Sequence, residues 1–400
     1  MTHTDTTDVT VPRASESAQP TGRRLPLLDV LRGAAILGTL MTNVWIFTGP
    51  GAEWGALQSG SGEQSLGSVG GAVEGVFSVL ANGKFLSLLT ILFGVGLAIQ
   101  YASAARRGQP WPGRYRWRAL FLFGEGTVHF VLVFAWDVLM GYAVTALLVA
   151  WLLTRSERAQ RRVMWWAAGV HLTVIGLLTA ALALADNDGG GTVSRDVVDL
   201  YAHGGYPDQI AFRLQNAIAL RMEPVLTFFL LLFLFLLGVR LFRAGAFGAD
   251  ETGRRLRSRL LAWGLGLGLP LNAAAVLAGP DLFLVARYGT APLLALGYIG
   301  LIGAVVDRVR RPGPLMTGLT SVGRTALSGY VLQNVLCVLI SYGIGLGLAQ
   351  RFGDTGPWWP WWVVGLWITV CAVLMVGSTL WLRRFSAGPL ESVQKWALRH

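Results

Sequence analysis

Long runs of apolar residues, separated by short polar segments rich in arginine, make up most of the chain after residue 26. A helix needs about 20 mostly apolar residues to cross the hydrocarbon core of a membrane. The runs that meet this requirement are 27–48, 78–101, 118–136, 138–154, 163–185, 224–242, 260–279, 288–306, 325–349 and 358–382. The pattern therefore predicts an all-α fold, a polytopic transmembrane helical bundle of about ten helices.

Two segments depart from this simple pattern. The second span is interrupted near its start by Asn82, Gly83 and Lys84. The stretch 69–80 before the interruption is predicted to be a short interfacial or re-entrant helix that leads into the span. The largest polar segment between two spans, 186–223, is too short for a separate domain. We expect it to form a lid, or a pair of surface helices, over an outer vestibule.

The basic residues predict how the bundle is oriented. Most of the 33 Lys and Arg residues fall in every second polar segment, for example in 155–162 and 308–311. Because positive charge accumulates in cytoplasmic segments, the alternation places both ends of the chain in the cytoplasm. The polar stretch 1–24 is then a disordered cytoplasmic tail. The transmembrane domain covers 25–392, and 393–400 is a second cytoplasmic tail.

Composition supports the membrane assignment and excludes some functions. Hydrophobic residues make up 53% of the chain and charged residues 14%, whereas a soluble domain has about 25% charged residues. The net charge of +11 does not indicate a nucleic-acid partner, because the arginines lie in short clusters between apolar runs. The partner that these clusters fit is the lipid bilayer. Cys337 and Cys371 lie inside apolar runs and are interpreted as packing residues, and no spacing typical of a metal site is present.

The first span carries three polar side chains that are expected to point into the bundle. Arg32 and Asn43 are eleven residues apart, which is about three helical turns, so they share one face of the helix. Asp29 lies one turn before Arg32. Ionisable groups in hydrocarbon are costly, so each is a candidate for function. The alternative for Asp29 and Arg32 is a structural ion pair near the inner interface.

The third span carries Glu125 and His129, four residues apart and therefore on one face. Asp137 follows near the outer end of the span. A histidine near an acid can act as a general base at neutral pH, and Glu125 is a candidate to orient the imidazole or balance its charge. The alternative is a buried polar contact that fixes helix packing. His171 lies in an otherwise apolar run and is interpreted as a core histidine.

Further polar groups lie in other spans. Lys84 either reaches outward to the interface or has a function. Glu223, before Pro224, is interpreted as an acid at a helix start. Arg324 immediately precedes the ninth span, and the polar residues within it include Tyr330, Gln333 and Asn334. They predict a helix that lines a cavity, and the glycines that follow, at 343, 345 and 347, predict tight helix contact.

Four short motifs occur in a fixed order along the chain. They are Leu28-Asp29-Val30-Leu31-Arg32-Gly33 with Asn43; Lys84-Phe85-Leu86-Ser87-Leu88; His129 with Trp136-Asp137 and Tyr142; and Gly323-Arg324 with Tyr330, Gln333 and, at the end, Gly388-Pro389-Leu390-Glu391. In this order they resemble the YeiB family of bacterial membrane proteins, also described as domain of unknown function 418. The resemblance covers 25–392 and implies a C-terminal family domain over about 224–392. It also implies that the protein lies in a bacterial inner (plasma) membrane.

The first helix of that family is similar to that of the transmembrane acyltransferases, which include sugar O-acetyltransferases. The resemblance implies acyl-CoA as a cytoplasmic co-substrate, without a metal, and a small-molecule or lipid-linked acceptor. Many of those enzymes have a catalytic histidine where this chain has Asn43. We therefore expect His129 to take that role, oriented by Glu125 or Asp137.

The remaining candidate residues are given roles by the same resemblance. Arg32 and Arg324 are expected to meet the phosphates of acyl-CoA. The residues expected to bind the thioester or the acceptor are Asp29, Asn43, Lys84, Tyr330, Gln333 and Asn334.

Two other classes of function fit the same residues. A transporter or permease for a small solute or lipid-linked precursor would use the buried charges for proton coupling. A non-catalytic membrane partner, of the kind that confers immunity, would use them for folding. Self-association as a homodimer is a further hypothesis.

Overall fold

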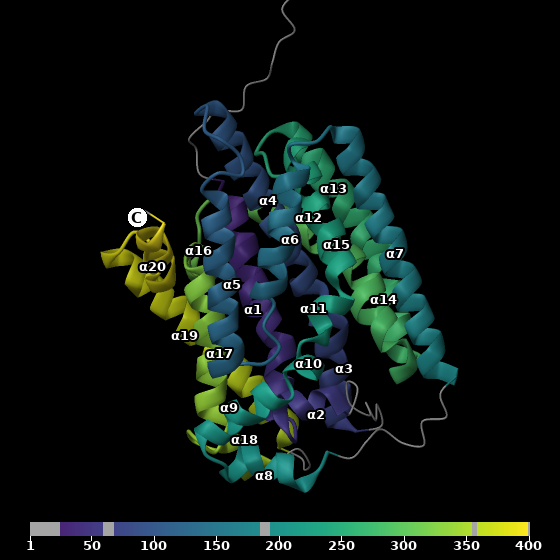
Figure 1. The fold of residues 1–400 in the computed structure, drawn as a ribbon, viewed down its shortest axis with the longest axis vertical. Coiled ribbons are helices and arrows are strands. Elements are labelled where there is room, and N and C mark those ends of the chain that lie inside the picture. Colours follow the sequence, from purple (N-terminus) through teal and green to yellow (C-terminus); the bar gives the residue numbers. More distant parts are fainter. Residues whose placement is uncertain (1–24, 59–67, 185–192, 354–357, 399–400) are drawn as a thin grey trace, which may run out of the picture.

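The computed structural model describes residues 25–58, 68–184, 193–353 and 358–398, and within these ranges the chain is helical with no β-strand. Figure 1 shows the arrangement of the helices. They are α1 (Pro26–Thr48), α2 (Ala52–Gln58), α3 (Val69–Ala81), α4 (Lys84–Arg106), α5 (Tyr115–Leu132), α6 (Leu139–Leu152), α7 (Glu157–Leu184), α8 (Arg195–His203), α9 (Tyr206–Gln215), α10 (Ala217–Leu220), α11 (Met222–Leu226), α12 (Phe228–Arg243), α13 (Glu251–Gly266), α14 (Gly268–Leu277), η1 (Pro280–Leu282), η2 (Val285–Thr290), α15 (Ala291–Arg308), α16 (Pro314–Arg324), α17 (Ala326–Ser341), α18 (Leu348–Phe352), α19 (Trp359–Arg384) and α20 (Pro389–Ala397). The predicted tail 1–24 lies outside the described residues.

Six helical segments of the described residues are long and apolar enough to cross a membrane. They are Pro26–Thr48, Val69–Arg106, Glu157–Leu184, Glu251–Leu277, Pro280–Arg308 and Trp359–Arg384. Two shorter apolar helices, α6 and α17, add to them. The all-α class and the membrane character are thus confirmed. The number of crossings and the side on which the termini lie stay predictions.

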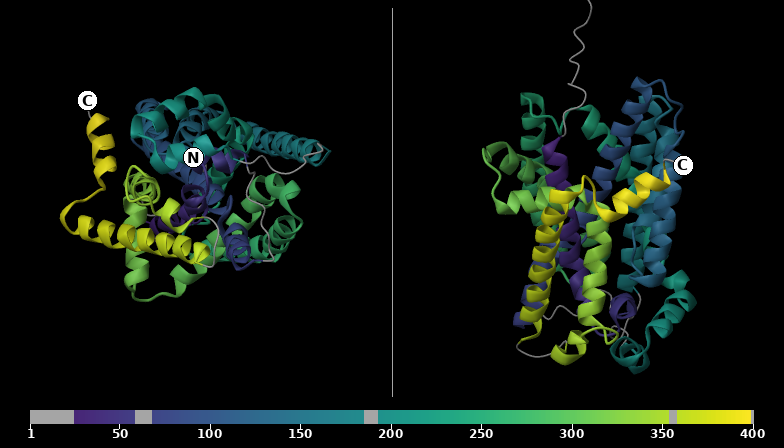
Figure 2. Two further views of the ribbon diagram at one scale, coloured as in Figure 1. Left: turned by 90° about the horizontal axis from the view of Figure 1, so that it is seen from below. Right: turned by 90° about the vertical axis from the view of Figure 1, so that its left-hand side faces the viewer.

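Helix α1 runs through the middle of the bundle (Figure 2). It begins with Pro26, which suits the first helical turn because proline lacks an N–H group that would have no partner there. Its close neighbour is α16. A Cβ atom on Gly33 would lie 2.0 Å from the Leu319 carbonyl oxygen, and one on Gly323 would lie 1.7 Å from the Asp29 carbonyl oxygen. These two glycines let the two backbones touch.

The interruption predicted in the second span is real. Helix α3 ends at Ala81 and α4 begins at Lys84, so the predicted short helix is confirmed, and the span starts at Lys84 rather than at residue 78. Gly83 has a φ of +78°. A Cβ atom on this residue would lie 2.1 Å from the Arg287 carbonyl oxygen. Glycine is required there, both for the left-handed backbone and for the contact.

The prediction for the ninth span, 325–349, was wrong in its extent. The helix ends at Ser341, and the residues 342–347 that follow are not helical. Gly343 donates its N–H to the Tyr201 carbonyl of α8 at 3.0 Å, and Gly347 has a φ of +62°. The three glycines therefore build a loop that packs on α8, rather than a contact between two long helices.

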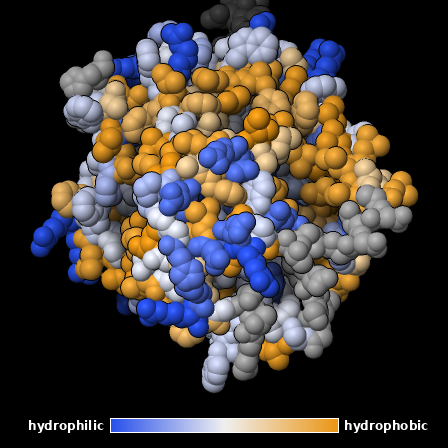
Figure 3. All heavy atoms as spheres, turned by 60° about the horizontal axis from the view of Figure 1, so that its bottom comes forward, coloured by the Kyte–Doolittle hydropathy of each residue, from blue (hydrophilic) through white to orange (hydrophobic). Residues whose placement is uncertain are grey.

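The two ends of the bundle differ in structure. At the bottom of Figure 1 lie α2, α8, α9 and α18, and at the top lie the arginine-rich loops and the start of α1. We call these the outer end and the inner end, following the predicted orientation. The described part of the predicted outer segment, 193–223, contains α8 and α9, and in addition to the expected pair it contains the short helix α10 and the start of α11. Figure 3 shows hydrophobic side chains along the flank and polar ones gathered toward the outer end.

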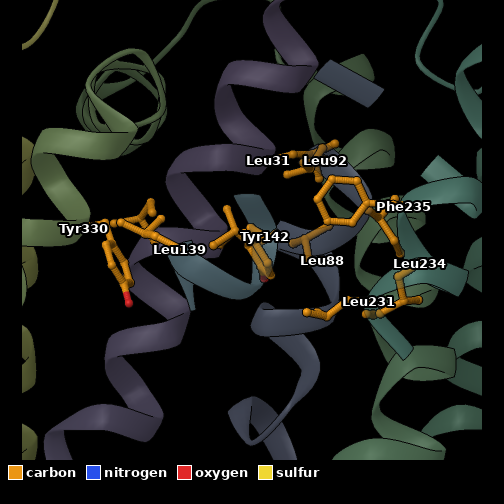
Figure 4. Close-up of a cluster of buried hydrophobic side chains, with 14 of the residues drawn as sticks. Leu31, Leu88, Leu92, Leu139, Tyr142, Leu231, Leu234, Phe235 and Tyr330 are labelled. Atoms are coloured by element: carbon orange, nitrogen blue, oxygen red, sulfur yellow. The ribbon is translucent and has the colours of Figure 1, made fainter. Parts of the chain in front are cut away.

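The apolar core lies between α1, α4, α6 and α12. Figure 4 shows part of it, with Leu31, Leu88, Leu92, Tyr142, Leu231, Leu234 and Phe235. Tyr330 of α17 lies at the edge of this cluster, beside Leu139. The core thus ends at a tyrosine whose hydroxyl belongs to a polar cluster.

Replacing Gly323 with alanine is expected to destabilise the protein by about 1–3 kcal/mol, the usual cost of overpacking a tight contact. The added methyl group would collide with backbone, which cannot rotate away, so α1 and α16 must separate. Thermal unfolding in detergent measures the effect. The matched control is Gly169→Ala in α7, where a Cβ would meet nothing within 4 Å. Equal melting temperatures for the two variants would contradict the prediction.

Candidate functional site

A polar cluster lies inside the bundle where α5, the start of α6 and α17 meet. His129 Nδ1 is 3.4 Å from Asp137 Oδ1, and the Tyr330 hydroxyl donates to the same oxygen at 3.3 Å. Asn334 Nδ2 lies 3.1 Å from His129 Nε2. An amide nitrogen only donates, so Nε2 is the acceptor in this contact when the ring proton is on Nδ1, the nitrogen that faces Asp137. We call these four residues the histidine cluster.

The turn after α5 positions Asp137. The helix ends at Leu132, and the chain turns back so that Asp137 lies at the start of α6. Its Oδ2 accepts the backbone N–H of Leu139 at 2.9 Å and of Met140 at 3.3 Å. These bonds satisfy donors that a helix start leaves free. Gly126 of α5 leaves room, because a Cβ there would lie 2.7 Å from Asp137 Oδ2.

Side chains from the outer segment hold the same turn by its backbone. The Tyr206 hydroxyl donates to the Leu132 carbonyl at 2.5 Å, and Arg213 Nη1 donates to the Val131 carbonyl at 3.4 Å. Arg221 Nη1 donates to the Asp137 carbonyl at 2.9 Å. The sequence marked these residues as parts of an outer segment, but gave no sign that they reach the turn beside His129.

Glu125 does not orient His129. The two residues share a face of α5, but Asp137 is the acid that faces the imidazole. Both carboxylate oxygens of Glu125 are buried and have no hydrogen-bond partner among the described residues. Of the two acids considered for this role, the geometry favours Asp137.

A cavity of about 280 Å³ lies at the inner end of the bundle. Both arginines predicted to bind phosphate, Arg32 and Arg324, line it. Arg118 is a third arginine on its wall, which sequence reasoning missed because it lies in a cluster assigned only to orientation. Arg32 also forms the predicted pair with Asp29, at 3.4 Å. Apolar side chains, including Leu92, line the deeper part.

Two further cavities continue from the first toward the outer end. The middle one has a volume of about 40 Å³ and is lined by Asn43 and Glu223 among others, and the outer one has a volume of about 330 Å³. Tyr330 lines both the inner and the middle cavity. Trp136 and Arg287 line both the middle and the outer one. The three cavities therefore follow one another through the bundle.

Several predicted residues lie next to these cavities rather than on their walls. His129 contacts Tyr330, with ring centroids 5.2 Å apart, but lines none of the three cavities. Gln333 Nε2 donates to the Thr39 hydroxyl at 3.4 Å, and Thr39 lines the middle cavity. The Gln333 and Asn334 side-chain oxygens are buried without a hydrogen-bond partner among the described residues.

Lys84 does not reach outward to the interface. Its side chain is fully buried, and Nζ donates to the Ser78 carbonyl at 2.7 Å. The alternative in which Lys84 extends to the membrane surface was therefore wrong. His171 Nε2 lies 3.1 Å from the Tyr288 carbonyl, which confirms it as a core histidine. The two cysteines are free and buried, as expected of packing residues.

Two ion pairs, one partly and one fully buried, were not predicted. Arg287 Nη2 lies 2.7 Å from Glu223 Oε1, which also accepts the Tyr288 hydroxyl, and Arg287 donates to the Asn82 side-chain oxygen as well. Glu223 is thus more than a helix-start acid. At the outer end, Arg213 Nη2 lies 3.1 Å from Glu53 Oε1, with both side chains fully buried.

The fold and this site define a polytopic helical membrane protein with an internal polar cluster beside a series of cavities. Residues 241–399 match the family described as "Protein of unknown function (DUF418)". The chain is 28% identical to the uncharacterized protein YxaH of Bacillus subtilis (strain 168) over 397 residues, which cover 94% of each chain. It is 26% identical to the uncharacterized protein YeiB of Escherichia coli (strain K12) over 388 residues, 91% of this chain and 93% of YeiB.

These matches confirm the resemblance that the four motifs predicted. Residues 241–399 match the DUF418 family, and the chain is similar to YeiB and YxaH over most of its length. The similarity to the transmembrane acyltransferases is not part of these matches and stays a prediction.

Proposed function

We propose that this protein transfers an acyl group from cytoplasmic acyl-CoA to a hydroxyl or amine acceptor at or across the membrane. The observation that carries the proposal is the position of Tyr330. It lines both the inner and the middle cavity, and its hydroxyl contacts the Asp137 carboxylate that faces His129. A donor that enters from the inner end and an acceptor that enters from the outer end would meet at this tyrosine.

The inner cavity fits the donor by its charge and its shape. Arg32, Arg118 and Arg324 supply three guanidinium groups at its wall, and guanidinium binds phosphate through paired, charge-assisted hydrogen bonds. Leu92 and Leu139 line the same cavity and suit the uncharged pantetheine arm. The thioester would then lie nearest Tyr330.

His129 is the proposed general base. Its Nε2 has the lone pair that accepts a proton, and Asp137 faces Nδ1 and would stabilise the positive charge that forms. The acceptor oxygen would attack the thioester carbonyl as its proton passes to Nε2. The C–S bond then breaks, and the thiolate of CoA takes up that proton. Since Asn334 Nδ2 lies 3.1 Å from Nε2, the acceptor must displace Asn334 to reach it.

Release of free thiol from acetyl-CoA by the purified protein in nanodiscs tests the proposal. Even without the natural acceptor, water in the site is expected to give slow, protein-dependent hydrolysis. Propionyl-CoA and palmitoyl-CoA, assayed in parallel, report the acyl chain that the site prefers. If none of the three is cleaved or transferred, with or without a bacterial membrane extract as acceptor, the proposal is rejected.

Replacing Arg32 and Arg324 with glutamine is expected to raise the KM for acyl-CoA about 10- to 100-fold for each arginine, since a charged hydrogen bond contributes about 1.5–3 kcal/mol. The kcat should change little, because these side chains bind the phosphates and not the reacting carbonyl. Steady-state thiol release measures both constants. Arg310→Gln, an exposed inner-end arginine outside the cavity, is the matched control. Equal KM values for all three variants would contradict the assignment.

Transport of a small solute or lipid-linked precursor is the second candidate function. The observation that favours it is the series of three cavities, with the partly buried pair of Arg287 and Glu223 beside the middle one. Proteoliposomes loaded with a panel of sugars and amino acids separate the two functions. Uptake that is unaltered by acyl-CoA, without thiol release, supports transport. Thiol release without uptake supports acyl transfer.

A further inference from the structure

A fourth cavity lies away from the histidine cluster, between α7 and α12 at the inner end of the bundle. Its volume is about 350 Å³. The polar residues on its wall include four arginines, Arg158 and Arg161 of α7 and Arg240 and Arg243 of α12, together with Glu157. We call it the arginine cavity. None of these arginines belongs to the proposed acyl-transfer site.

The arginine cavity carries an excess of positive charge. Arg243 is held by the protein itself, because its Nη1 donates to Gln160 Oε1 at 2.9 Å and lies 3.4 Å from Glu157 Oε1. Arg158, Arg161 and Arg240 form no ion pair with an acidic side chain among the described residues. Three guanidinium groups that share one cavity repel each other unless an anion lies between them.

The surroundings of the cavity are those of a membrane surface. Trp165 and Trp166 lie about one helical turn further along α7 from Arg161, and both are exposed, at 60% and 58%. Tryptophan is enriched where the hydrocarbon core meets the headgroups. In the most apolar 18-residue stretch of α7, only 22% of the residues are buried within the protein. The apolar face of this helix is therefore free for lipid. Two almost fully buried apolar side chains, Met164 and Leu236, also line the cavity.

We propose that the arginine cavity binds the phosphate of an anionic phospholipid, of the phosphatidylglycerol type, from the inner leaflet. The headgroup phosphate accepts hydrogen bonds from Arg158, Arg161 and Arg240, and the acyl chains lie along α7 past Trp165. Arginines suit this role because the planar guanidinium matches two phosphate oxygens at once. The apolar surface next to the cavity favours a lipid over free phosphate, which would gain nothing from it.

Native mass spectrometry of the full chain, released from nanodiscs of phosphatidylcholine and phosphatidylglycerol, tests this site. The cavity variant carries Arg158→Gln, Arg161→Gln and Arg240→Gln. The control variant carries Arg259→Gln, Arg310→Gln and Arg311→Gln, which remove the same charge from exposed positions at the inner end outside the cavity. All six positions are exposed, and the single variant Arg161→Gln provides a second measurement if the triple variant does not purify.

We expect phosphatidylglycerol to be retained on the native protein and to bind about 10- to 100-fold more weakly to the cavity variant. The control should change less than twofold, and Arg161→Gln about fivefold. Equal weakening in both triple variants would mean that only the general charge of the inner end attracts the lipid, and would overturn the proposal. Displacement of phosphatidylglycerol by millimolar inorganic phosphate, or equal retention of phosphatidylcholine, would overturn it as well.

Discussion

Replacing His129 with alanine is expected to lower the rate of acyl transfer about 10²- to 10⁴-fold, the contribution of a positioned general base. The KM for acyl-CoA should stay close to its original value, because the imidazole lies away from the arginines of the inner cavity. Thiol release under saturating acetyl-CoA measures kcat. Asn334→Ala should have a smaller effect, since Asn334 only occupies Nε2 until the acceptor arrives.

The control for this prediction is His171→Ala. His171 is also buried in a helix, and its Nε2 lies 3.1 Å from a backbone carbonyl, so its loss reports the structural cost of removing a core imidazole. Melting temperatures of both variants in detergent separate folding from chemistry. A His129→Ala protein that turns over at the native rate would remove the general base from the mechanism. An equal loss of rate in both variants at equal melting temperature would do the same.

The helices were predictable from sequence because a long apolar run is a local signal. The break at Asn82 and Gly83 was local too, since a glycine with positive φ and the amide before it interrupt the run. Tyr330, Asn334 and His129 were each identified from the rarity of polar groups in apolar runs. The sequence offered two acids as partners of His129, Glu125 by its spacing within the helix and Asp137, and the structure places Asp137 at the imidazole.

The partners themselves depend on packing between distant elements. The contact of Asn334 with His129 joins residues 205 positions apart, and Asp137 reaches the imidazole only because the chain reverses after Leu132. Periodicity within a single helix cannot predict either contact. The predicted extent of the ninth span was wrong for a related reason. The glycines after Ser341 mark a backbone contact with α8, and a stretch of small residues looks the same in a helix interface as in such a loop.

The buried pair of Glu53 and Arg213 shows the same limit for charged residues. Both lie in polar segments between apolar runs, where a charge is normally solvated. Instead the outer helices enclose them, and Glu53 also accepts the Tyr342 hydroxyl at 3.1 Å and the backbone N–H of Ala135 at 3.4 Å. Ala135 belongs to the turn that carries Asp137. The pair therefore connects α2, α9 and the loop after α17 with the turn that positions the histidine cluster.

Replacing Glu53 with glutamine is expected to destabilise the folded protein by about 3–5 kcal/mol, because it leaves the fully buried Arg213 without its counter-charge. Equilibrium unfolding in detergent measures the free energy. The double variant Glu53→Leu with Arg213→Leu should lose less than the two single changes together, since no charge is then buried alone. Acyl transfer should fall in the single variant as well, because the turn at Ala135 loosens.

The matched control is Glu251→Gln, which breaks an exposed pair with Arg255 whose atoms lie 2.5 Å apart. An exposed pair one helical turn apart contributes about 0.3–0.5 kcal/mol, so this variant should unfold almost as the native protein does. The two pairs have the same chemistry and differ in burial, so the difference between the variants measures what burial adds. If Glu53→Gln and Glu251→Gln unfold alike, Arg213 reaches water, and the outer helices do not enclose the pair.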